Sequence, residues 1–407
     1  MSPTITKKSW TVMVYMAGDN SLDPDGVKDL KEMKKVGSTD KLNIIAQFDR
    51  AAGHVARRYY LRKGGIVTGD AVESMGAVNT GDPKCLSDFI QWGVKSYPAD
   101  HYLLVLWNHG QGWDDTDIYA DERHRSLRRL ASGPISHAFF RTPVRQTMEK
   151  ARTNEAARAI LLDDNAKDFL DNLEMKKVLS GASKLMKHKL DILGMDACLM
   201  SMAEVGYQVH GSTAYTVGSE ETEPGEGWPY NTILGALAKN PEMTPREFST
   251  LIVDKYLASY KEKDGVTLSA CDLSAAGSLA AAVASLAVAL QACLSDSSKR
   301  QRILAVRNQV QSYYVPDNID LADFCTLLAK ADVGSAVATA CQNVVKEVKS
   351  GYVIVQGYKG ADMKNSNGVA IYFPLKSVSP LYAGLDFSKK TGWDKFLKAF
   401  LSAIRSR

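Results

Sequence analysis

Short apolar runs rich in β-branched and aromatic residues alternate with amphipathic helical patterns through the first half of this chain of 407 residues. The runs stand at residues 10–16, 42–48, 102–107 and 190–195, and the helical patterns between them cover residues 25–36, 83–94 and 173–186. A further short run, Arg57 to Leu61, is typical of a hairpin or edge strand. Because buried strands that alternate with helices form a mostly parallel sheet covered on both faces, the pattern predicts an α/β fold.

The pattern changes near Pro241. Helical periodicity dominates at residues 244–260, 274–294 and 300–313, and strand candidates return only at residues 352–356 and 368–373. We therefore expect two domains: an α/β domain over residues 1–240 and a largely helical domain over residues 241–407 that contains some strand.

The net charge of +4 comes from one local segment. Residues 122–152 contain eight Lys and Arg residues against two Glu residues, whereas the remainder of the chain has 42 basic and 44 acidic residues. Because that remainder is slightly acidic, the charge does not indicate a nucleic-acid-binding surface. We expect no nucleic-acid partner.

The cysteines and the apolar tracts bear on metal sites and location. The six cysteines are widely spaced, with no C-x-x-C pair, so we expect neither a disulfide framework nor a metal site. The long apolar tract from Ala275 to Ala292 is rich in Ala and Ser, and its larger residues recur at helical spacing, which predicts a core helix and no membrane contact. The first apolar run is only about seven residues long, which is too short for an export signal, so we expect a cytoplasmic protein by default.

The segments that follow the third and fourth of these strands carry the candidate chemistry. The strand at 102–107 leads into His109 and Gly110, and the strand at 190–195 leads into Asp196 and Cys198. Functional groups collect at the carboxyl ends of strands in an open α/β sheet, so we expect His109 and Cys198 to lie together. A thiolate at a helix N-terminus has a lowered pKa, and a histidine beside it can protonate a leaving group. The pair therefore predicts nucleophilic catalysis.

Asp196 admits two interpretations. If residues 196–198 are extended, its carboxylate lies on the same face as the Cys198 thiol and would recognise a cationic group. Alternatively, Asp196 caps the helix that is expected to follow Cys198.

The order of these motifs resembles that of the caspase-like (clan CD) cysteine peptidases, and the fuller pattern resembles the clostripain family. The matching stretches run from near the start to near the end of the chain, and their number and order make the resemblance specific. They are residues 10–20 (WTVMVYMAGDN), 106–113 (LWNHGQGW), 195–200 (MDACLM), 218–230 (GSEETEPGEGWPY) and 368–374 (GVAIYFP).

The resemblance implies a caspase-like sheet and a cysteine endopeptidase with a Cys-His dyad. Cys198 would be the nucleophile and His109 the proton donor. The backbone N–H groups of Gly110 and Cys198 would form the oxyanion hole.

The resemblance also implies a preference for Arg, or Lys, immediately before the cleaved bond. Asp196 would be the acidic residue of the pocket for that side chain. Residues 217–221 would line the same pocket, with backbone groups near Ser219 holding the substrate and Glu220 or Glu221 supplying a second carboxylate. We expect a monomer whose partners are peptide or protein substrates.

Activation by self-cleavage of an internal loop is a further implication of the resemblance. The expected processing loop is the basic segment at about residues 122–160. Four arginines that lie 14 to 20 positions beyond His109 are the candidate cleavage sites: Arg123, Arg125, Arg128 and Arg129. The alternative is a solvated basic loop with no regulatory role.

No cofactor is expected to be required, although calcium is an open alternative because some members of the resembled family need it. The candidate ligands form an acidic cluster of Asp114, Asp115, Asp117 and Asp121. Their spacing does not fit an EF-hand loop, which favours a solvated acidic loop. Some members of that family are also secreted, which leaves the location open.

Other functions compete with this interpretation. A catalytically silent caspase-like protein would bind peptides or a partner through the same fold, but the intact dyad argues against it. A nucleotide-binding α/β protein would need a P-loop or a G-x-G-x-x-G turn after a strand, and the sequence has neither. The absence of a G-x-S-x-G elbow excludes a typical serine hydrolase.

Overall fold

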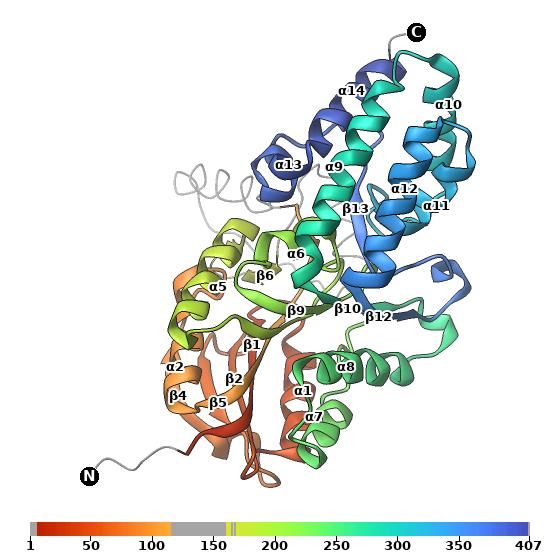
Figure 1. The fold of residues 1–407 in the computed structure, drawn as a ribbon. Helices are drawn as coiled ribbons and strands as arrows, with labels where there is room; N and C mark the ends of the chain where they lie inside the picture. The colour runs from red at the N-terminus through yellow and green to blue at the C-terminus, as the bar shows by residue number, and fades with distance from the viewer. Residues whose placement is uncertain (1–5, 115–159, 164–165, 167, 406–407) are drawn as a thin grey trace, which may run out of the picture.

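The computed structural model describes residues 6–114, 160–163, 166 and 168–405, which form an α/β layer structure with a helical layer at one end (Figure 1). The expected cleavage sites Arg123, Arg125, Arg128 and Arg129 lie outside the described residues. The same holds for Asp115, Asp117 and Asp121 of the acidic cluster.

Nine strands form the central sheet in the order β12–β10–β9–β8–β5–β1–β2–β3–β4. Neighbours from β9 to β2 are parallel, whereas the outer strands on both sides pair antiparallel. The strands are β1 (Lys8–Gly18), β2 (Leu42–Arg50), β3 (Ala56–Tyr60), β4 (Ala71–Gly76), β5 (Ala99–Trp107), β8 (Leu190–Asp196), β9 (Thr213–Gly218), β10 (Thr267–Asp272) and β12 (Val353–Tyr358). The predicted mostly parallel sheet is confirmed.

Both faces of the sheet are buried because helices cover each of them (Figure 1). Along β1 the side chains alternate, so that Val12 and Val14 enter one core while Met13 and Tyr15 enter the other. The first core is covered by α1 (Asp23–Val36), α7 (Tyr230–Lys239) and α8 (Pro245–Ser259), and the second by α2 (Pro83–Ser96), α5 (Asn172–Met186) and α6 (Ala203–Val209).

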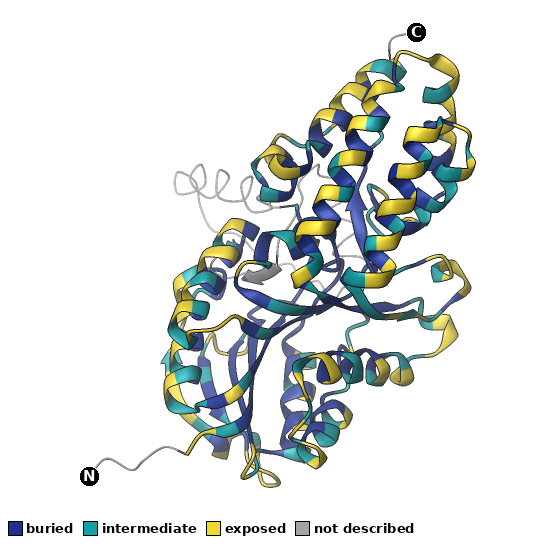
Figure 2. Ribbon diagram, viewed as in Figure 1, coloured by how far each residue is buried: buried dark blue, intermediate teal, exposed yellow. Residues whose placement is uncertain are grey.

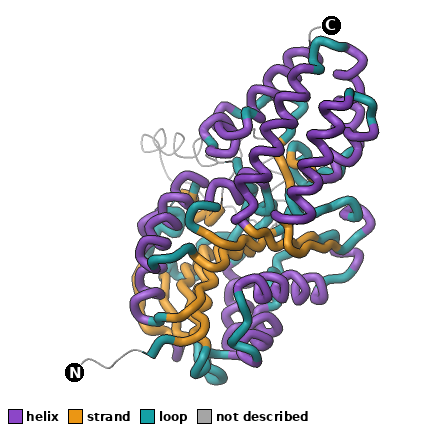
Figure 3. The backbone as a smooth tube through the Cα atoms, viewed as in Figure 1, coloured by secondary structure: helices purple, strands orange, loops and turns teal. Residues whose placement is uncertain are grey.

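The helical layer lies on both sides of β12 in the chain and packs at one end of the sheet (Figure 3). Its helices are α9 (Ala276–Ala292), α10 (Ser297–Gln309), α11 (Leu321–Lys330), α12 (Ser335–Glu347), α13 (Asp386–Thr391) and α14 (Trp393–Arg405). Two small antiparallel pairs complete the strands: β6 (Ile160–Asp163) with β7 (Asp168–Leu170), and β11 (Asn318–Asp320) with β13 (Ala370–Tyr372). Single helical turns stand at Val67–Asp70, Glu262–Asp264, Leu273–Ala275, Val348–Tyr352, Ala361–Met363 and Pro380–Gly384.

The expected boundary between residues 240 and 241 does not coincide with an edge of the sheet. The strands β10 and β12 lie beyond it, yet both belong to the central sheet, and α8 packs against them. The helical layer therefore begins at α9. The sequence of β10, TLSACD, alternates apolar with small polar residues that are themselves buried, so no apolar run marks it as a sheet strand.

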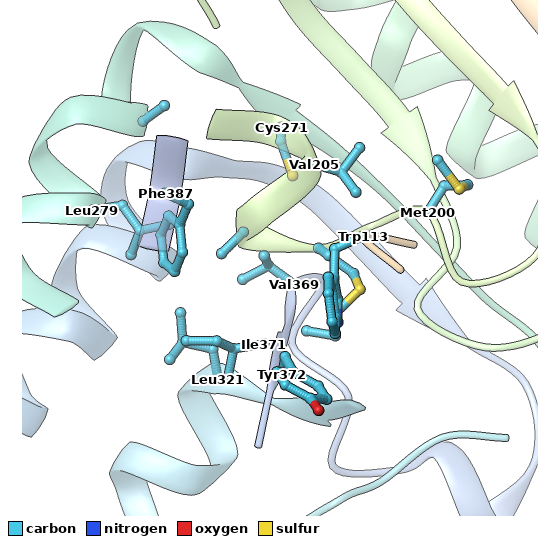
Figure 4. Close-up of a cluster of buried hydrophobic side chains, with 14 of the residues drawn as sticks. Trp113, Met200, Val205, Cys271, Leu279, Leu321, Val369, Ile371, Tyr372 and Phe387 are labelled. Atoms are coloured by element: carbon cyan, nitrogen blue, oxygen red, sulfur yellow. The ribbon is translucent and has the colours of Figure 1, made fainter. Parts of the chain in front are cut away.

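A continuous hydrophobic core joins the sheet to the helical layer. Trp113 packs against Tyr372 of β13, with ring centroids 4.4 Å apart, and Met200 lies in the same cluster (Figure 4). Among the described residues, one helical stretch, Leu273–Ala292, is long and apolar enough to span a membrane by composition alone. Half of its apolar window is buried inside the fold, and Figure 2 shows α9 in alternating buried and exposed turns.

Candidate active site

The carboxyl ends of β5 and β8 place the predicted dyad together. In the parallel register Trp107 is the partner of Asp196, and His109 and Cys198 each lie two residues farther along the chain. The sheet order reverses beside these strands, since β1 has β2 on one side and β5 on the other. A crevice at such a switch point is the usual ligand site of an open α/β sheet. His109 and Cys198 line one small cavity there.

The backbone around His109 is fixed by contacts to the end of β1. The Asn108 side chain donates a hydrogen bond to the carbonyl of Ala17. His109 is buried, and its Nε2 lies 3.2 Å from the hydroxyl of Ser21, which is located just before α1. Ser21 therefore holds one imidazole nitrogen, whichever of the two groups carries the shared hydrogen.

The Cys198 loop is held by the strand end of β9. The N–H of Leu199 donates to the carbonyl of Glu221 at 3.1 Å, and the N–H of Ser201 donates to the carbonyl of Ser219 at 2.8 Å. A Cβ at Gly110 would come within 2.6 Å of the Cys198 carbonyl oxygen. Only glycine therefore lets the His109 loop approach the Cys198 backbone this closely.

The expected helix N-terminus at Cys198 is not present. The helix α6 begins at Ala203 and its N-cap is Met202, so a loop separates the thiol from the helix. Burial raises the pKa of Cys198 to about 12. The prediction of a thiol with a lowered pKa is therefore wrong for this conformation, because the desolvation of Cys198 has no helix end to offset it.

A backbone segment covers the thiol. The N–H of Glu223 donates to Cys198 Sγ at 3.2 Å, and the thiol lies 3.9 Å from the carbonyl of the same residue. The cavity that His109 and Cys198 share has a volume of only about 30 Å³, which is room for about one water molecule. This conformation has no space for a substrate side chain.

Asp196 lies beneath this cavity and is not a helix cap. Its carboxylate accepts hydrogen bonds from the Tyr230 hydroxyl at 2.7 Å and the Trp228 N–H at 3.3 Å. Burial raises the pKa of Asp196 to about 6, and the hydrogen bond from Tyr230 acts against this rise. A Cβ on Gly227 would lie 3.0 Å from the carboxylate, so the loop packs directly on it.

Glu223 is the acidic residue that the sequence reasoning missed. Its carboxyl group is buried beside Asp196, close to the Trp228 side chain and the Ala197 backbone. Burial, followed by the charge of Asp196, raises the pKa of Glu223 well above its usual value. Because two ionised carboxylates this close would repel each other, Asp196 and Glu223 titrate as a coupled pair. Glu223 lies inside the stretch 218–230, but the sequence does not distinguish it from its acidic neighbours.

The other predicted pocket residues do not line this cavity. The Ser219 hydroxyl contacts that of Thr267 at 2.9 Å. Glu220 accepts hydrogen bonds from the Tyr313 hydroxyl at 2.7 Å and the Gly368 N–H at 3.1 Å, so it binds the helical layer and does not enter the cavity. The Glu221 carboxylate accepts a hydrogen bond from the Tyr314 N–H at 3.0 Å. Ser219 and Glu220 fix the loop, and the second carboxyl group in the cavity is that of Glu223.

An acidic cleft of about 670 Å³ adjoins the small cavity and shares residues 223–225 with it. None of its lining residues is Lys, Arg or His, and six are acidic. These six are Asp25, Glu221, Glu223, Glu226, Asp264 and Asp362. The segment that covers the thiol therefore separates Cys198 from a large negatively charged surface.

The described part of the chain contains no group of three His, Cys, Asp or Glu side chains arranged to hold a metal ion. Of the acidic cluster considered for calcium, only Asp114 lies within that part.

The fold and site define a class: a caspase-like α/β sheet that carries a histidine and a cysteine at the ends of neighbouring parallel strands. Comparison with known families is more specific. The model of the clostripain family matches residues 14–126 and 147–400, and the chain belongs to that family.

Individual relatives agree with this assignment. Clostripain of Hathewaya histolytica is 29% identical over 254 residues, which cover 55% of this chain and 41% of the relative, so the match spans less than half of that protein. A secreted C11 cysteine protease of Bacteroides thetaiotaomicron, solved with an irreversible peptide inhibitor, has a TM-score of 0.64 at 21% identity over 95% of this chain and 100% of its own. An inactive zymogen C11 protease of Parabacteroides distasonis has a TM-score of 0.65 at 21% identity, with 95% and 99% covered. The two structures show that the fold is shared.

Proposed function

We propose that this protein is a cysteine endopeptidase that cuts after Arg or Lys. The observation that carries the proposal is the pair of buried carboxyl groups, Asp196 and Glu223, beside Cys198. Both carboxyl groups are buried, and burial raises the pKa of each, so ionising them in the closed site is costly unless a cation enters. A guanidinium offers five N–H donors in a planar fork and would satisfy both carboxyl groups.

The reaction would begin with attack of Cys198 Sγ on the substrate carbonyl carbon, with the thiol proton passing to His109. His109 then gives that proton to the leaving amine as the C–N bond breaks, which leaves a thioester on Cys198. Water, deprotonated by His109, attacks the thioester, releases the carboxylic acid and restores the thiol. The N–H groups of Gly110 and Cys198 would stabilise the oxyanion of each tetrahedral intermediate.

The acidic cleft supports a preference for further basic residues around the cleaved bond. Its six carboxyl groups would attract a polybasic segment, and the preference should weaken as salt screens the charges. Peptides with a second Arg near the cut should therefore be cleaved faster than peptides with Ala there, and the difference should shrink at high ionic strength.

The closed site supports synthesis as a precursor. The Glu223 segment covers the thiol, and the cavity is too small for an arginine side chain. We propose that cleavage in the basic segment at residues 122–160 precedes opening of this site. Wild-type protein should convert into two associated fragments, whereas a Cys198→Ala variant should stay intact. A wild-type chain that is fully active while intact would refute the activation step and leave the peptidase proposal standing.

The activity itself is tested with fluorogenic peptides that differ only in the residue before the cleaved bond. We expect Arg and Lys substrates to be hydrolysed and uncharged ones to be poor. Cys198→Ala should abolish hydrolysis, whereas Cys271→Ala is a matched control, because Cys271 is also a buried thiol with a pKa raised to about 12. Equal loss in both variants, or no labelling of Cys198 by an arginine-based thiol-reactive probe, would indicate a silent binding protein.

A further inference from the structure

A cavity of about 680 Å³ lies between α1 and the loop that follows β3, and no lining residue is shared with the active-site cavity or the acidic cleft. We call it the α1 groove. Its volume is within the range of about 300–1,000 Å³ that is typical of small-molecule sites. Nothing in the proposed peptidase reaction uses it.

The floor of the α1 groove is apolar. Val27 and Leu30 come from α1, Phe48 comes from β2, and Ile66 and Val67 come from the loop. Ile66 is 74% exposed, the highest value among the large exposed apolar side chains of the described chain. Leu30 and Phe48 are themselves almost fully buried, so Ile66 is the apolar side chain that a ligand in the groove would cover most.

The rim of the α1 groove is cationic. Six of its lining residues are basic and none is acidic: Lys31, Lys34, Lys35, Arg50, Arg57 and Lys63. On α1, the groove residues at positions 27, 30, 31, 34 and 35 follow helical spacing and form one face. Lys31 and Lys35 are therefore like charges four residues apart, and Lys35 is ion-paired with Glu32 at 3.9 Å.

Only part of this charge is neutralised within the described chain. The Arg50 guanidinium forms two hydrogen bonds to Asp23, at 2.8 and 2.9 Å, and Lys34 is ion-paired with Asp70. No carboxylate of a described residue lies within 4.0 Å of the charged nitrogens of Lys31, Arg57 or Lys63. These three cations are available to an anion.

The wall of the groove is fixed in place. Lys34 Nζ donates to the carbonyl of Arg62 at 3.0 Å, and the Arg62 side chain reaches Asp70 at 3.0 Å. A Cβ at Gly37 would lie 2.1 Å from the backbone nitrogen of Lys63, so the end of α1 packs directly on the loop. A site that is largely formed before binding loses little affinity to reorganisation.

We propose that the α1 groove binds a free long-chain carboxylate, with the alkyl chain on the apolar floor and the carboxylate among Lys31, Arg57 and Lys63. The basic side chains of the rim favour an anionic head group, and the apolar floor of the groove favours an alkyl chain. A peptide fits less well, because the floor is built from side chains of a helix and of β2, an inner strand that is paired on both sides. No strand edge on the floor is available to pair with a peptide backbone.

The test is a calorimetric titration of the full-length Cys198→Ala protein with dodecanoate below its micelle-forming concentration. We expect saturable binding at one site that weakens with added salt. The double variant Lys31→Glu/Lys63→Glu should bind at least about tenfold more weakly, as should Ile66→Asp. Lys41→Glu/Lys330→Glu is the matched control, because it makes the same charge change at exposed lysines outside the groove and should bind as tightly as the parent.

Three results would overturn the proposal. The first is the absence of saturable dodecanoate binding up to about 1 mM, which would leave no usable affinity. The second is equal binding of dodecyltrimethylammonium, which has the same alkyl chain with a positive head and should be rejected by the cationic rim. The third is an acidic, apolar peptide that binds while dodecanoate does not. None of these results depends on peptidase activity.

Discussion

Replacing Tyr230 by phenylalanine removes one hydroxyl group and leaves the aromatic ring in place. In the structure that hydroxyl donates a hydrogen bond of 2.7 Å to the buried carboxylate of Asp196. The Trp228 N–H donates a second, longer hydrogen bond to this carboxylate, at 3.3 Å. Tyr230→Phe therefore withdraws the shorter of two bonds that stabilise the ionised form of Asp196.

The size of the effect follows from the kind of bond. A hydrogen bond to a charged group contributes about 1.5–3 kcal/mol. One pKa unit corresponds to about 1.4 kcal/mol, so the loss should raise the pKa of Asp196 by about one to two units. The starting value is about 6, already raised by burial, and Glu223 titrates together with Asp196. In Tyr230→Phe, Asp196 and Glu223 should therefore ionise only at a higher pH than in the wild type.

The assay is the pH dependence of kcat/KM for an arginine substrate, measured on the active form. In the proposed mechanism the ionised carboxylate binds the arginine side chain, so kcat/KM should rise as the pH increases through the pKa of the pair. In Tyr230→Phe the acidic limb should move upward by about one to two pH units, and kcat/KM near pH 6 should fall by about five- to fiftyfold.

The matched control is Tyr256→Phe. Tyr256 is also a fully buried tyrosine, but its hydroxyl has no hydrogen-bond partner, so the substitution removes no bond. Its pH profile should match that of the wild type. A Tyr230→Phe profile with an unmoved acidic limb, or an equal shift in Tyr256→Phe, would refute the role assigned to the Tyr230–Asp196 bond.

Three further substitutions test neighbouring contacts. Ser21→Ala removes the hydroxyl that lies 3.2 Å from His109 Nε2. We expect kcat to fall by about tenfold with little change in KM, and the limb of the pH profile that His109 determines to shift. An unchanged pH profile would exclude a positioning role for Ser21. Gly227→Ala places a Cβ 3.0 Å from Asp196 at a φ of +57°, which should lower the free energy of unfolding by about 1–2 kcal/mol in a urea titration, and no loss would contradict the observed packing. Burial raises the pKa of Asp29 to about 9, so the wild type should lose stability as the pH rises from about 4 to about 9. Asp29→Asn should flatten that dependence in melting experiments, and parallel curves would contradict the shifted pKa.

The central strands and the dyad could be predicted because their signals are local. The runs that became β1, β2, β5 and β8 are mostly apolar, since both of their faces are buried, and the strand ends then place His109 and Cys198 at one edge. The strand β10 and the domain boundary were not predictable in the same way. The pairing of β10 with β9 depends on contacts made far apart in the chain, and its buried Thr and Ser do not form an apolar pattern.

The sequence indicated which residue types gather at the site, but it did not indicate that the Cys198 thiol is covered and buried. The pattern D-A-C indicates a carboxylate near a thiol, and Asp196 is found there. Which of the glutamates in 218–230 faces that carboxylate depends on how the loop turns after β9, and this turn directs Glu220 toward Tyr313 and Glu223 toward Asp196. The raised pKa of Cys198 has a similar origin, because it follows from burial under a segment 25 residues away in the sequence.

The two strands that carry the dyad are hydrogen-bonded neighbours, although more than 80 residues of chain separate them. The β5–β8 ladder pairs Leu103 with Ile192 and Leu104 with Leu193 in the middle of the sheet, where all four side chains are buried. The sheet ladder, and not an unbroken chain between β5 and β8, therefore keeps His109 and Cys198 together. The protein could therefore be produced as two separate fragments, one carrying His109 on β5 and the other carrying Cys198 on β8. The two fragments would associate through the unpaired edges of these strands.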